Sequence, residues 1–484
     1  MAHETAGFGL MEYELVIGLE THVQLNTRTK MWCGCVNEYG SDSNTNVCPI
    51  CLGLPGALPV LNEAALRKAA LTGFLLNCSV PGYAKWDRKN YFYPDNPKNY
   101  QLTQLDFPST VGGYINFESL GEIVKVRINR AHLEEDVGKS FHFADYSGID
   151  FNRAGVPLLE IVTEPDINSA KMAYDYLNAL KNILEYGAVS DCDMEKGQVR
   201  CDVNISVRPK GQLEFGEKVE IKNMNSFSGI RRAITYEFKR QVEVLEKGGT
   251  LVQETRRWDD GAGLTDSMRA KEDAHDYRYF PDPDLMPHRP SDEWLSAIRA
   301  GVGELPLDRK KRMVSQYKIP HESADVFVRE PLLGDYFEQA AKGVENSKSV
   351  ANWVINNLQA KLVESGTTVD GLTFSPAAIG ELVELVESGK ISSKIAQEVF
   401  NEMFKSGVSP LDIIESKGLS QVSDTVQLKE FCEKVVATNS ASVDDFRNGK
   451  DAALNFLKGQ VMKVSRGKAN PKMVDDLLRE MLVD

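Results

Sequence analysis

Residues 14–25 read ELVIGLETHVQL, and from the middle of this stretch onward polar and apolar side chains alternate. In an extended strand, successive side chains point to opposite faces of the sheet. Glu20, His22 and Gln24 therefore share one face, and Leu19, Val23 and Leu25 lie on the other. The stretch predicts a strand with one apolar face and one face that carries ionisable groups.

Two later stretches repeat this alternation, residues 199–208 (VRCDVNISVR) and 218–223 (KVEIKN). Asp202 and Asn204 share a face of the first, and Glu220 stands between two apolar residues of the second. Oxygen ligands together with one histidine suit Mg²⁺ or Mn²⁺, which bridge nucleotide phosphates in phosphoryl transfer. A sheet that faces solvent also alternates polar residues, so the pattern leaves a metal site and a solvated face as alternatives.

The segment 132–138 (HLEEDVG) concentrates further ionisable groups. These are His132, Glu134, Glu135 and Asp136. The following GKS at 138–140 does not form a P-loop, because Leu133 stands where that motif needs its first glycine. If the chain uses ATP, the nucleotide site must be of another kind.

Four cysteines near the N-terminus have the spacing C-x-C-x12-C-x2-C: Cys33, Cys35, Cys48 and Cys51. Two close pairs separated by a short loop are typical of a tetrahedral Zn²⁺ site. With four sulfur ligands and no open position, such a site is structural. The alternatives are four free thiols in a reducing compartment, or two disulfides.

The aromatic segment 86–101 (WDRKNYFYPDNPKNYQ) mixes rings with basic residues in a stretch broken by proline. We interpret it as a loop whose aromatic residues either pack beneath it, stack on a base or contact a partner subunit.

The chain of 484 residues carries 56 basic and 70 acidic residues, a formal charge of −14, which argues against nonspecific coating of nucleic acid. Residues 447–472 reverse this balance, with a single acid, Asp451, among seven bases. The bases are Arg447, Lys450, Lys458, Lys463, Arg466, Lys468 and Lys472. This segment predicts either a polyanion-binding surface or a solvated helix face.

Apolar runs long enough for a membrane span are absent from the sequence, and residues 1–10 lack the pattern of a signal peptide. We therefore expect a cytoplasmic protein.

Strand-like and helix-like segments mix up to about residue 290, and helices dominate afterwards, which predicts an α+β protein. Helical spacing marks residues 62–77 and 168–187. The proline-rich stretch 279–290 (YFPDPDLMPHRP) suggests a boundary near residue 292. Beyond it, Ser375 should cap a helix that has Pro376 at its first position, and Ser409 should cap another in the same way.

Several of these segments together closely resemble the B subunit family of the bacterial tRNA-dependent amidotransferases. Besides the four cysteines, they are 18–25 (GLETHVQL), 86–98 (WDRKNYFYPDNPK), 132–140 (HLEEDVGKS), 151–166 (FNRAGVPLLEIVTEPD), 200–206 (RCDVNIS), 220–227 (EIKNMNSF) and 276–285 (DYRYFPDPDL). The resemblance implies a catalytic domain similar to the glutamine synthetase and guanidino kinase fold at 1–292. A helical domain at 293–409 and a small helical tail domain at 410–484, which contacts tRNA, would follow.

The chemistry implied by the resemblance is amidation of Glu-tRNA(Gln), Asp-tRNA(Asn) or both. Because a carboxylate is a poor electrophile, ATP would first phosphorylate it, and ammonia would then displace phosphate. The implied partners are an amidase A subunit that releases ammonia from glutamine, a small C subunit and the cognate aminoacyl-tRNA synthetase. The implied cofactors are ATP, Mg²⁺ or Mn²⁺, and a structural Zn²⁺ held by the four cysteines.

Matching the motifs residue by residue implies a site that binds the metal and its nucleotide. Its metal ligands would be Glu20, His22, Asp202 and Glu220. Glu135 corresponds to the group at the mouth of the ammonia channel and the phosphorylation site, and to a further cofactor contact. Lys89 corresponds to a channel or phosphate contact, and Arg153 and Glu160 to the same pocket.

Two alternatives remain beside this interpretation. A noncatalytic, zinc-containing scaffold that binds tRNA for another enzyme would explain the cysteines and the basic tail, but not the acidic strand faces. The archaeal paralogue specific for tRNA(Gln) carries an inserted domain, for which this chain has no room before its helical region.

Overall fold

The predicted strand at 14–25 is confirmed as β1 (Tyr13–Gln24), which lies in the interior of a nine-stranded sheet. The computed structural model describes residues 12–270, 276–419, 425–465 and 469–483. The strand order is β13-β12-β11-β10-β1-β9-β6-β4, and β5 pairs with β6. The remaining strands of this sheet are β4 (Thr110–Val111), β5 (Tyr114–Ser119), β6 (Glu122–Glu135), β9 (Pro157–Thr163), β10 (Val199–Pro209), β11 (Val219–Lys222), β12 (Glu254–Asp259) and β13 (Leu264–Ala270).

The three strands that the sequence predicts to carry metal ligands are neighbours in this sheet. β1 and β10 pair antiparallel from Tyr13 opposite Pro209 to Val23 opposite Val199. β10 then pairs with β11, also antiparallel. Their polar side chains therefore lie side by side on one face, which the sequence alone could not establish.

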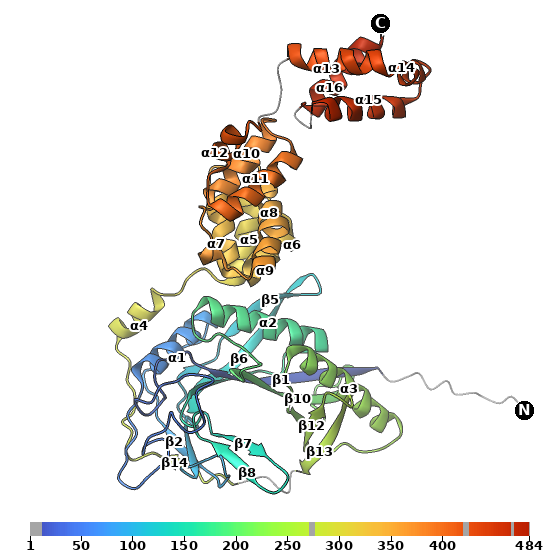
Figure 1. The fold of residues 1–484 in the computed structure, drawn as a ribbon. Helices are drawn as coiled ribbons and strands as arrows, with labels where there is room; N and C mark the ends of the chain where they lie inside the picture. The colour runs from blue at the N-terminus through green and yellow to red at the C-terminus, as the bar shows by residue number, and fades with distance from the viewer. Residues whose placement is uncertain (1–11, 271–275, 420–424, 466–468, 484) are drawn as a thin grey trace, which may run out of the picture. The chain divides into compact units, whose positions relative to one another are not determined.

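The opposite face of the sheet is apolar and covered by helices. These are α1 (Glu63–Leu75), α2 (Ala170–Tyr186) and α3 (Phe227–Glu246), which lie together on one side of the sheet (Figure 1). Ile17, Leu19 and Val23 of β1 are fully buried in the core that α2 and α3 help to form. The helices predicted at 62–77 and 168–187 are thus confirmed.

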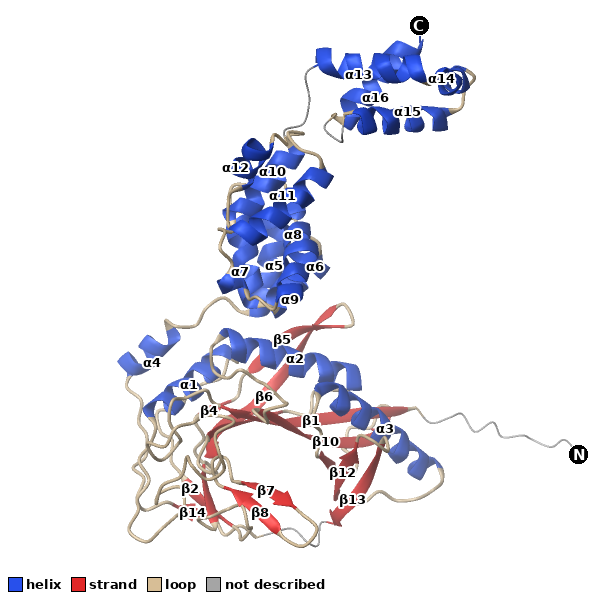
Figure 2. Ribbon diagram, in the orientation of Figure 1, coloured by secondary structure: helices blue, strands red, loops and turns tan. Residues whose placement is uncertain are grey.

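Smaller strands lie on the other side of the sheet (Figure 2). A three-stranded sheet has the order β14-β2-β3, and a separate hairpin joins β7 to β8. Their bounds are β2 (Asp87–Asn90), β3 (Tyr100–Thr103), β7 (Lys139–His142), β8 (Ser147–Asp150) and β14 (Phe280–Pro281). The predicted metal ligands Glu20, His22, Asp202 and Glu220 lie on the polar face of the large sheet, the side on which these small strands lie.

The aromatic segment 86–101 is not the irregular loop that the sequence suggested, since both of its ends form strands, β2 and β3. Trp86 is buried in the core, where its ring packs edge-on against Trp32 at 6.0 Å between centroids. Phe92 and Tyr93, in contrast, are well exposed. The prolines and asparagines therefore form the connection between two short strands.

After β14 the chain continues to pack against the N-terminal unit. His288 exchanges two backbone hydrogen bonds with Ala84, of 2.8 and 3.0 Å, and its ring lies 5.1 Å from that of Trp294. Trp294 belongs to α4 (Asp292–Arg299) and packs against the N-terminal core, as does Leu305. This unit, the first of two, ends at Leu307.

The second unit, Asp308–Asp484, is helical in its described residues and contains two apolar cores. The first core is built by α5 (Pro306–Tyr317), α6 (His321–Arg329), α7 (Pro331–Ala340), α8 (Ser347–Trp353), the π-helix η2 (Val354–Leu358), α9 (Gln359–Ser365), the short 3-10 helix η3 (Val369–Gly371), α10 (Ala377–Glu387), α11 (Ser393–Ser406) and α12 (Pro410–Lys417). The predicted cap of α12 is confirmed, because Ser409 accepts a hydrogen bond from the Asp412 amide. The predicted cap at Ser375 is wrong: α10 begins one residue later, Pro376 is its N-cap, and no side chain caps it.

The second core of this unit is formed by the last four helices. They are α13 (Thr425–Thr438), α14 (Ser440–Arg447), α15 (Asp451–Val464) and α16 (Pro471–Val483). Of the predicted basic surface, Arg466 and Lys468 lie outside the described residues. Lys458 is paired with Asp475 at 2.7 Å, whereas Lys463 and Lys472 have no acidic partner among the described residues. Among the described helices, none is both long and apolar enough to cross a lipid bilayer.

Asn62 is predicted to stabilise the N-terminal unit through the start of α1. Its Oδ1 accepts hydrogen bonds from the Ala64 and Ala65 amides, and its Nδ2 donates to the carbonyls of Thr29 and Lys30. Because Asn62→Ala removes both the helix cap and this link, we expect the free energy of unfolding to fall by about 1–2 kcal/mol. Asn178→Ala, a matched change inside α2, should alter it by less than about 0.5 kcal/mol. Urea unfolding followed by tryptophan fluorescence tests both, and equal effects would contradict the prediction.

His288 should make stability depend on pH. Burial lowers its pKa from the usual value of 6.5, so the unfolded chain binds the proton more readily than the folded one. Its contribution to stability is therefore present above pH 6.5 and is lost as the pH falls. His288→Phe keeps a ring beside Trp294. We expect its melting temperature to fall less between pH 7.5 and pH 5.5 than that of the unsubstituted chain. An identical loss, measured by calorimetry, would contradict this role.

Candidate functional site

A cluster of histidine and glutamate side chains forms the centre of the polar face. His22 Nε2 lies 3.3 Å from Glu160 Oε2 and 3.6 Å from Glu134 Oε1. His132 Nε2 approaches Glu160 Oε2 from the other side, at 3.4 Å. The strand register explains this arrangement, because Glu160 of β9 stands directly between His22 of β1 and His132 of β6. One potential ligand atom from each of His22, Glu134 and Glu160 lies within 4.8 Å of the others, so these three residues could hold a metal ion.

Within this cluster, the carboxylate of Glu160 and the imidazole of His22 each stabilise the charged form of the other. Burial disfavours a charged imidazole, but the hydrogen bond and charge of Glu160 outweigh it, and the net pKa of His22 is raised. Burial also disfavours ionised Glu160, but contacts with His132 and His22 hold its pKa well below the usual value. Glu160 is therefore an anion at neutral pH, which a metal ligand must be.

Lys89 approaches the same cluster from the small sheet on the other side. It lies on β2, and its ammonium stands 5.1 Å from the centre of the Tyr277 ring. Burial would lower the pKa of Lys89, but the nearby charges of Glu134 and Glu160 raise it. The ammonium of Lys89 is thus near enough to interact with the charges of this cluster, and it could contact an anionic substrate bound there.

Next to the cluster, a second group of charges is centred on Asp136. This buried carboxylate lies 2.9 Å from Arg200 and accepts a hydrogen bond of 2.9 Å from Gln24. Arg153 approaches it at 3.6 Å and also donates to the carbonyls of Val137 and Gly138. The structure therefore places Arg153 beside the cluster rather than inside it.

The other predicted metal ligands form a second group on β1, β10 and β11, near enough to the first that the charge of Asp202 helps to raise the pKa of His22. Glu20 stands opposite Asp202 in the register and accepts a hydrogen bond of 2.7 Å from Asn204. Asp202 forms an ion pair with Lys222, whose ammonium also lies 2.9 Å from Glu220. The four ligands predicted from the sequence are therefore divided in the structure, with His22 in the first cluster and the three carboxylates in this one.

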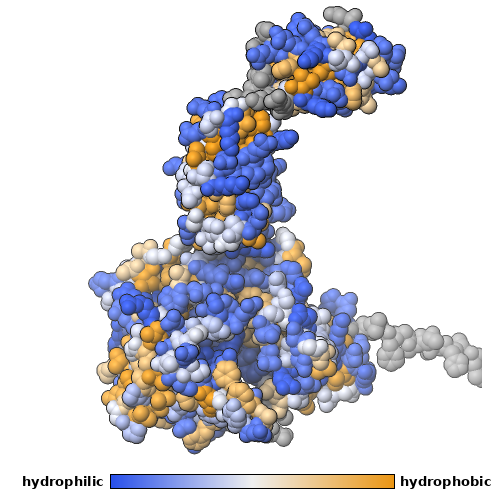
Figure 3. Space-filling model, in the orientation of Figure 1, coloured by the Kyte–Doolittle hydropathy of each residue, from blue (hydrophilic) through white to orange (hydrophobic). Residues whose placement is uncertain are grey.

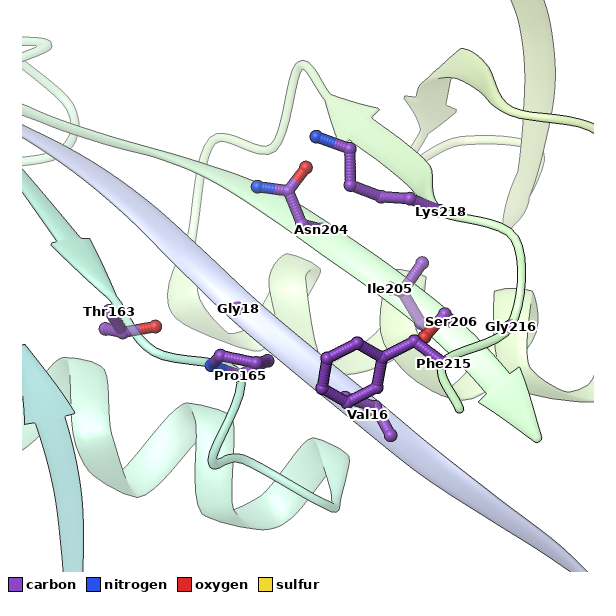
Figure 4. A pocket seen from close by; sticks show the side chains of 10 residues that line it. All are labelled: Val16, Gly18, Thr163, Pro165, Asn204, Ile205, Ser206, Phe215, Gly216 and Lys218. Atoms are coloured by element: carbon purple, nitrogen blue, oxygen red, sulfur yellow. The ribbon is translucent and has the colours of Figure 1, made fainter. Parts of the chain in front are cut away.

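A pocket opens beside these carboxylates, at the end of the polar face near Val16 (Figure 4). Gly18 forms its floor without a side chain, and Asn204, whose amide also bonds Glu20, lines its wall. The Phe215 ring lies along one side, and Lys218 lines the pocket beyond Asn204. Its volume of about 250 Å³ is slightly below the roughly 300–1,000 Å³ of most ligand pockets, so it fits one part of a ligand.

Glu135 points away from this face. Alternation along β6 places it on the side of Leu133, where it is buried. Its carboxylate pairs with Lys98 and accepts a hydrogen bond of 2.9 Å from the Leu102 amide. Burial raises the pKa of Glu135 despite the charge of Lys98. The neighbouring residues Glu134 and Glu135 thus lie in two different environments, the first in the histidine and glutamate cluster and the second beside Lys98.

The four cysteines come together as their spacing predicts. The Cys51 sulfur lies 3.4 Å from that of Cys33 and 3.7 Å from those of Cys35 and Cys48. The buried ammonium of Lys30 stands 3.6 Å from the same sulfur. A hydrogen bond from Cys33 lowers the pKa of Cys51, as does the charge of Lys30, although burial opposes both. The set could hold a metal ion.

Apolar side chains gather on the surface of the N-terminal unit, over the part that carries β2 and β14 (Figure 3). Phe92 and Phe280 line one pocket of about 380 Å³, together with Lys98, the partner of Glu135. Phe92 is 80% exposed, and Met286, which follows Phe280 closely in the sequence, is 83% exposed. Apolar surface of this kind is typical of a protein interaction site.

Sequence reasoning missed several members of the site. Glu134 was noticed only as part of HLEEDVG, although its alternation with His132 places both on one face. Glu160 was assigned to the pocket only through the family resemblance, because periodicity shows no more than that it shares a face with buried Leu158. Lys222 gave no signal, because a lysine after EI reads as ordinary surface charge. Asp136 follows the end of its strand, where periodicity no longer indicates direction.

Comparison with known proteins identifies the family. Residues 15–296 match the family described as the GatB/GatE catalytic domain, and residues 335–482 match the GatB domain. The chain is 51% identical over 478 residues to the B subunit of the aspartyl/glutamyl-tRNA(Asn/Gln) amidotransferase of Carboxydothermus hydrogenoformans, covering 98% of this chain and 99% of that protein. The corresponding protein of Persephonella marina is 51% identical over 473 residues, and that of Thermoanaerobacter sp. is 48% identical over 473 residues, each covering 98% of this chain and 100% of the relative.

With both domain families matched and this identity along nearly its whole length, the chain belongs to the family of the aspartyl/glutamyl-tRNA(Asn/Gln) amidotransferase B subunits.

Proposed function

We propose that this chain activates the side-chain carboxylate of Glu-tRNA(Gln), Asp-tRNA(Asn) or both with ATP, and then directs ammonia onto it. The observation that carries this proposal is the convergence of His22, Glu134 and Glu160 on one face of the sheet, with Lys89 of β2 near enough for its charge to interact with both glutamates. Negative charge must be neutralised wherever a phosphoryl group is transferred. A noncatalytic scaffold would not need such a set of buried charges.

ATP is proposed to lie along the polar face. Its nucleoside would fill the pocket of Gly18, Asn204 and Phe215, where the ring of Phe215 can stack on a base. Its phosphates would then extend toward Glu20 and Asp202. A bound Mg²⁺ or Mn²⁺ would supply charge neutralisation to the transferring phosphoryl group.

The chain's own residues would orient the substrates and hold the charges. Lys89 is placed to contact the incoming carboxylate or its phosphorylated form, because its charge lies near those of Glu134 and Glu160. Arg153 would keep Asp136 in position, through the contact at 3.6 Å. The small strands β2 and β14 lie on the side of the polar face, where they would limit the access of water to the activated carboxylate.

Glu135 is proposed to act at the mouth of the ammonia path rather than on the phosphoryl group. It lies behind the cluster and pairs with Lys98, and Lys98 lines the pocket that opens beside Phe92 and Phe280. A buried carboxylate next to such an opening can accept the proton that ammonia must lose.

The cysteine cluster is proposed to bind a structural Zn²⁺. A tetrahedron with Zn–S bonds of about 2.3 Å has sulfur–sulfur separations of about 3.8 Å. The separations from Cys51, 3.4 to 3.7 Å, come close to this value. Four thiolates would leave such a centre with net negative charge, and buried Lys30 is placed to balance it.

The remaining assignments concern partners and domain fold. We propose that an amidase A subunit and a small C subunit complete the enzyme. The amidase would cover the apolar surface around Phe92. The helices from Thr425 onward would contact tRNA through basic residues such as Lys463 and Lys472. The cognate aminoacyl-tRNA synthetase is proposed as the source of the mischarged tRNA. The large sheet, in which β11 and β12 pair parallel and the other pairs are antiparallel, carries helices on one face, and this arrangement supports the proposed similarity to the glutamine synthetase and guanidino kinase fold.

Glu134 and Glu135 offer a matched pair that tests the proposed chemistry, because they are adjacent in sequence and face different environments. In the complex with both partner subunits, Glu134→Gln should lower ADP release with Glu-tRNA(Gln) by about 100-fold, since it removes a charge from the cluster. Glu135→Gln should retain most of that ADP release but lose glutamine-dependent amidation. Circular dichroism of both variants controls for folding.

Equal loss of ADP release in both variants would contradict the separate role of Glu135. No ADP release from the unsubstituted complex with either mischarged tRNA would contradict the proposed function.

The cysteine site predicts a fixed metal content. The purified chain should contain about one zinc, and Cys48→Ser should lose it and melt at a lower temperature, because the folded state binds metal that the unfolded chain does not retain. Cys78→Ser is the matched control, since Cys78 is also a buried cysteine but is not one of the four in the cluster. This substitution should leave the zinc content unchanged. Elemental analysis measures both, and a zinc-free unsubstituted protein would contradict the assignment.

A further inference from the structure

Lys222 lies between two carboxylates of the proposed nucleotide site. Its ammonium forms an ion pair with Asp202 of the neighbouring strand and lies 2.9 Å from Glu220 on its own strand. Both carboxylate side chains are largely buried, at 20% and 21% exposure. Burial would lower the pKa of Lys222, but the two carboxylates outweigh it and raise the pKa, so the residue is an ammonium at neutral pH.

The position of Lys222 distinguishes the two carboxylate groups on the polar face. In the first cluster, His22, Glu134 and Glu160 face one another and can take a metal once His22 releases its proton, without displacing a lysine or arginine side chain. In the second, one oxygen of Asp202 and one of Glu220 already bind an ammonium. A divalent cation and Lys222 cannot occupy the same oxygens, so they compete for them.

We propose that Lys222 is a resident cation of the second carboxylate group, which the divalent ion displaces only when it arrives with the nucleotide, and that the displaced ammonium then contacts the nucleotide phosphates. This inference rests on the proposed function, because it takes Glu20, Asp202 and Glu220 as the residues that face the phosphates. Lys222 is then a positioning residue that also determines the order of binding.

Electrostatics explains why the nucleotide is required. If a metal alone displaced Lys222, the ammonium would remain partly buried with no anion beside it, which is costly. Phosphates supply the missing partner, and the flexible four-carbon stem of lysine lets the charge move to them. Mg²⁺ also prefers one or two carboxylates together with substrate phosphates over a site made of protein alone.

The test compares Lys222→Met with Lys210→Met in the full chain bound to its partner subunits. Lys210 lies just beyond the end of β10, is largely exposed and pairs with Glu12, so its replacement removes the same charge away from the site. Mn²⁺ binding without nucleotide is counted by electron paramagnetic resonance, and the affinity for ATP is measured by calorimetry at saturating Mn²⁺.

Opposite shifts are expected in the two measurements. Lys222→Met should bind one more Mn²⁺ per chain without nucleotide than the unsubstituted protein, and should bind ATP about tenfold more weakly, roughly the loss of one charge-assisted contact. Lys210→Met should change neither. Lys222→Gln serves as a second charge-removing variant if the methionine variant does not fold.

An unchanged Mn²⁺ count in the Lys222 variants would overturn the inference, as would unchanged or tighter binding of ATP. Failure of the proposed function is seen separately, because the unsubstituted complex would then show no ATP binding at any Mn²⁺ concentration.

Discussion

The register of β1 determines which of its side chains lie on the polar face of the large sheet and which lie on the apolar face. β1 pairs with β10 along nearly its whole length and with β9 from Glu20 to Gln24. Because strand side chains alternate, a slip of one residue would turn Leu19 and Val23 toward the polar face and bury Glu20 and His22 against the helices. The apolar contacts with α2 and α3 therefore maintain the positions of groups that those helices never touch.

Charge compensation on the polar face uses cations of two kinds. Asp136 is held by Arg200 and Arg153, whose guanidinium groups stay charged and offer a fixed fork of donors. Glu160 instead faces an imidazole of His22, which can lose its proton and become a metal ligand. The two arginines thus keep the charge of Asp136 compensated at all times. At Glu160, in contrast, a bound metal can replace the proton of His22 as the compensating charge.

The sequence allowed the strands, their faces and the cysteine cluster to be predicted, since each depends on local periodicity or spacing. β1, β10 and β11 were predicted with the correct polar sides, and the structure adds that they are neighbours. Other features depend on tertiary contacts. Alternation could have separated Glu134 from Glu135, but only the register of β6 with β9 shows that Glu134 meets His22.

Local signals also failed where geometry overrode preference. Ser375 before Pro376 resembles the Ser-Pro start of α12, yet Pro376 already has helical dihedral angles and acts as the N-cap itself. Trp86 lies in a polar segment interrupted by proline but fills the core against Trp32, because β2 and β3 fold that segment back onto the sheet.

The cysteine loop is connected to the site by long-range backbone hydrogen bonds. Met31 donates to the Gly155 carbonyl at 2.7 Å, and the Gly155 amide donates to the Asp136 carbonyl at 2.9 Å. Gly155 has φ +85°, a conformation that side-chain-bearing residues rarely adopt, so this turn cannot easily relax. Since Arg153 begins the turn, whatever orders the cysteine loop also fixes the guanidinium beside Asp136.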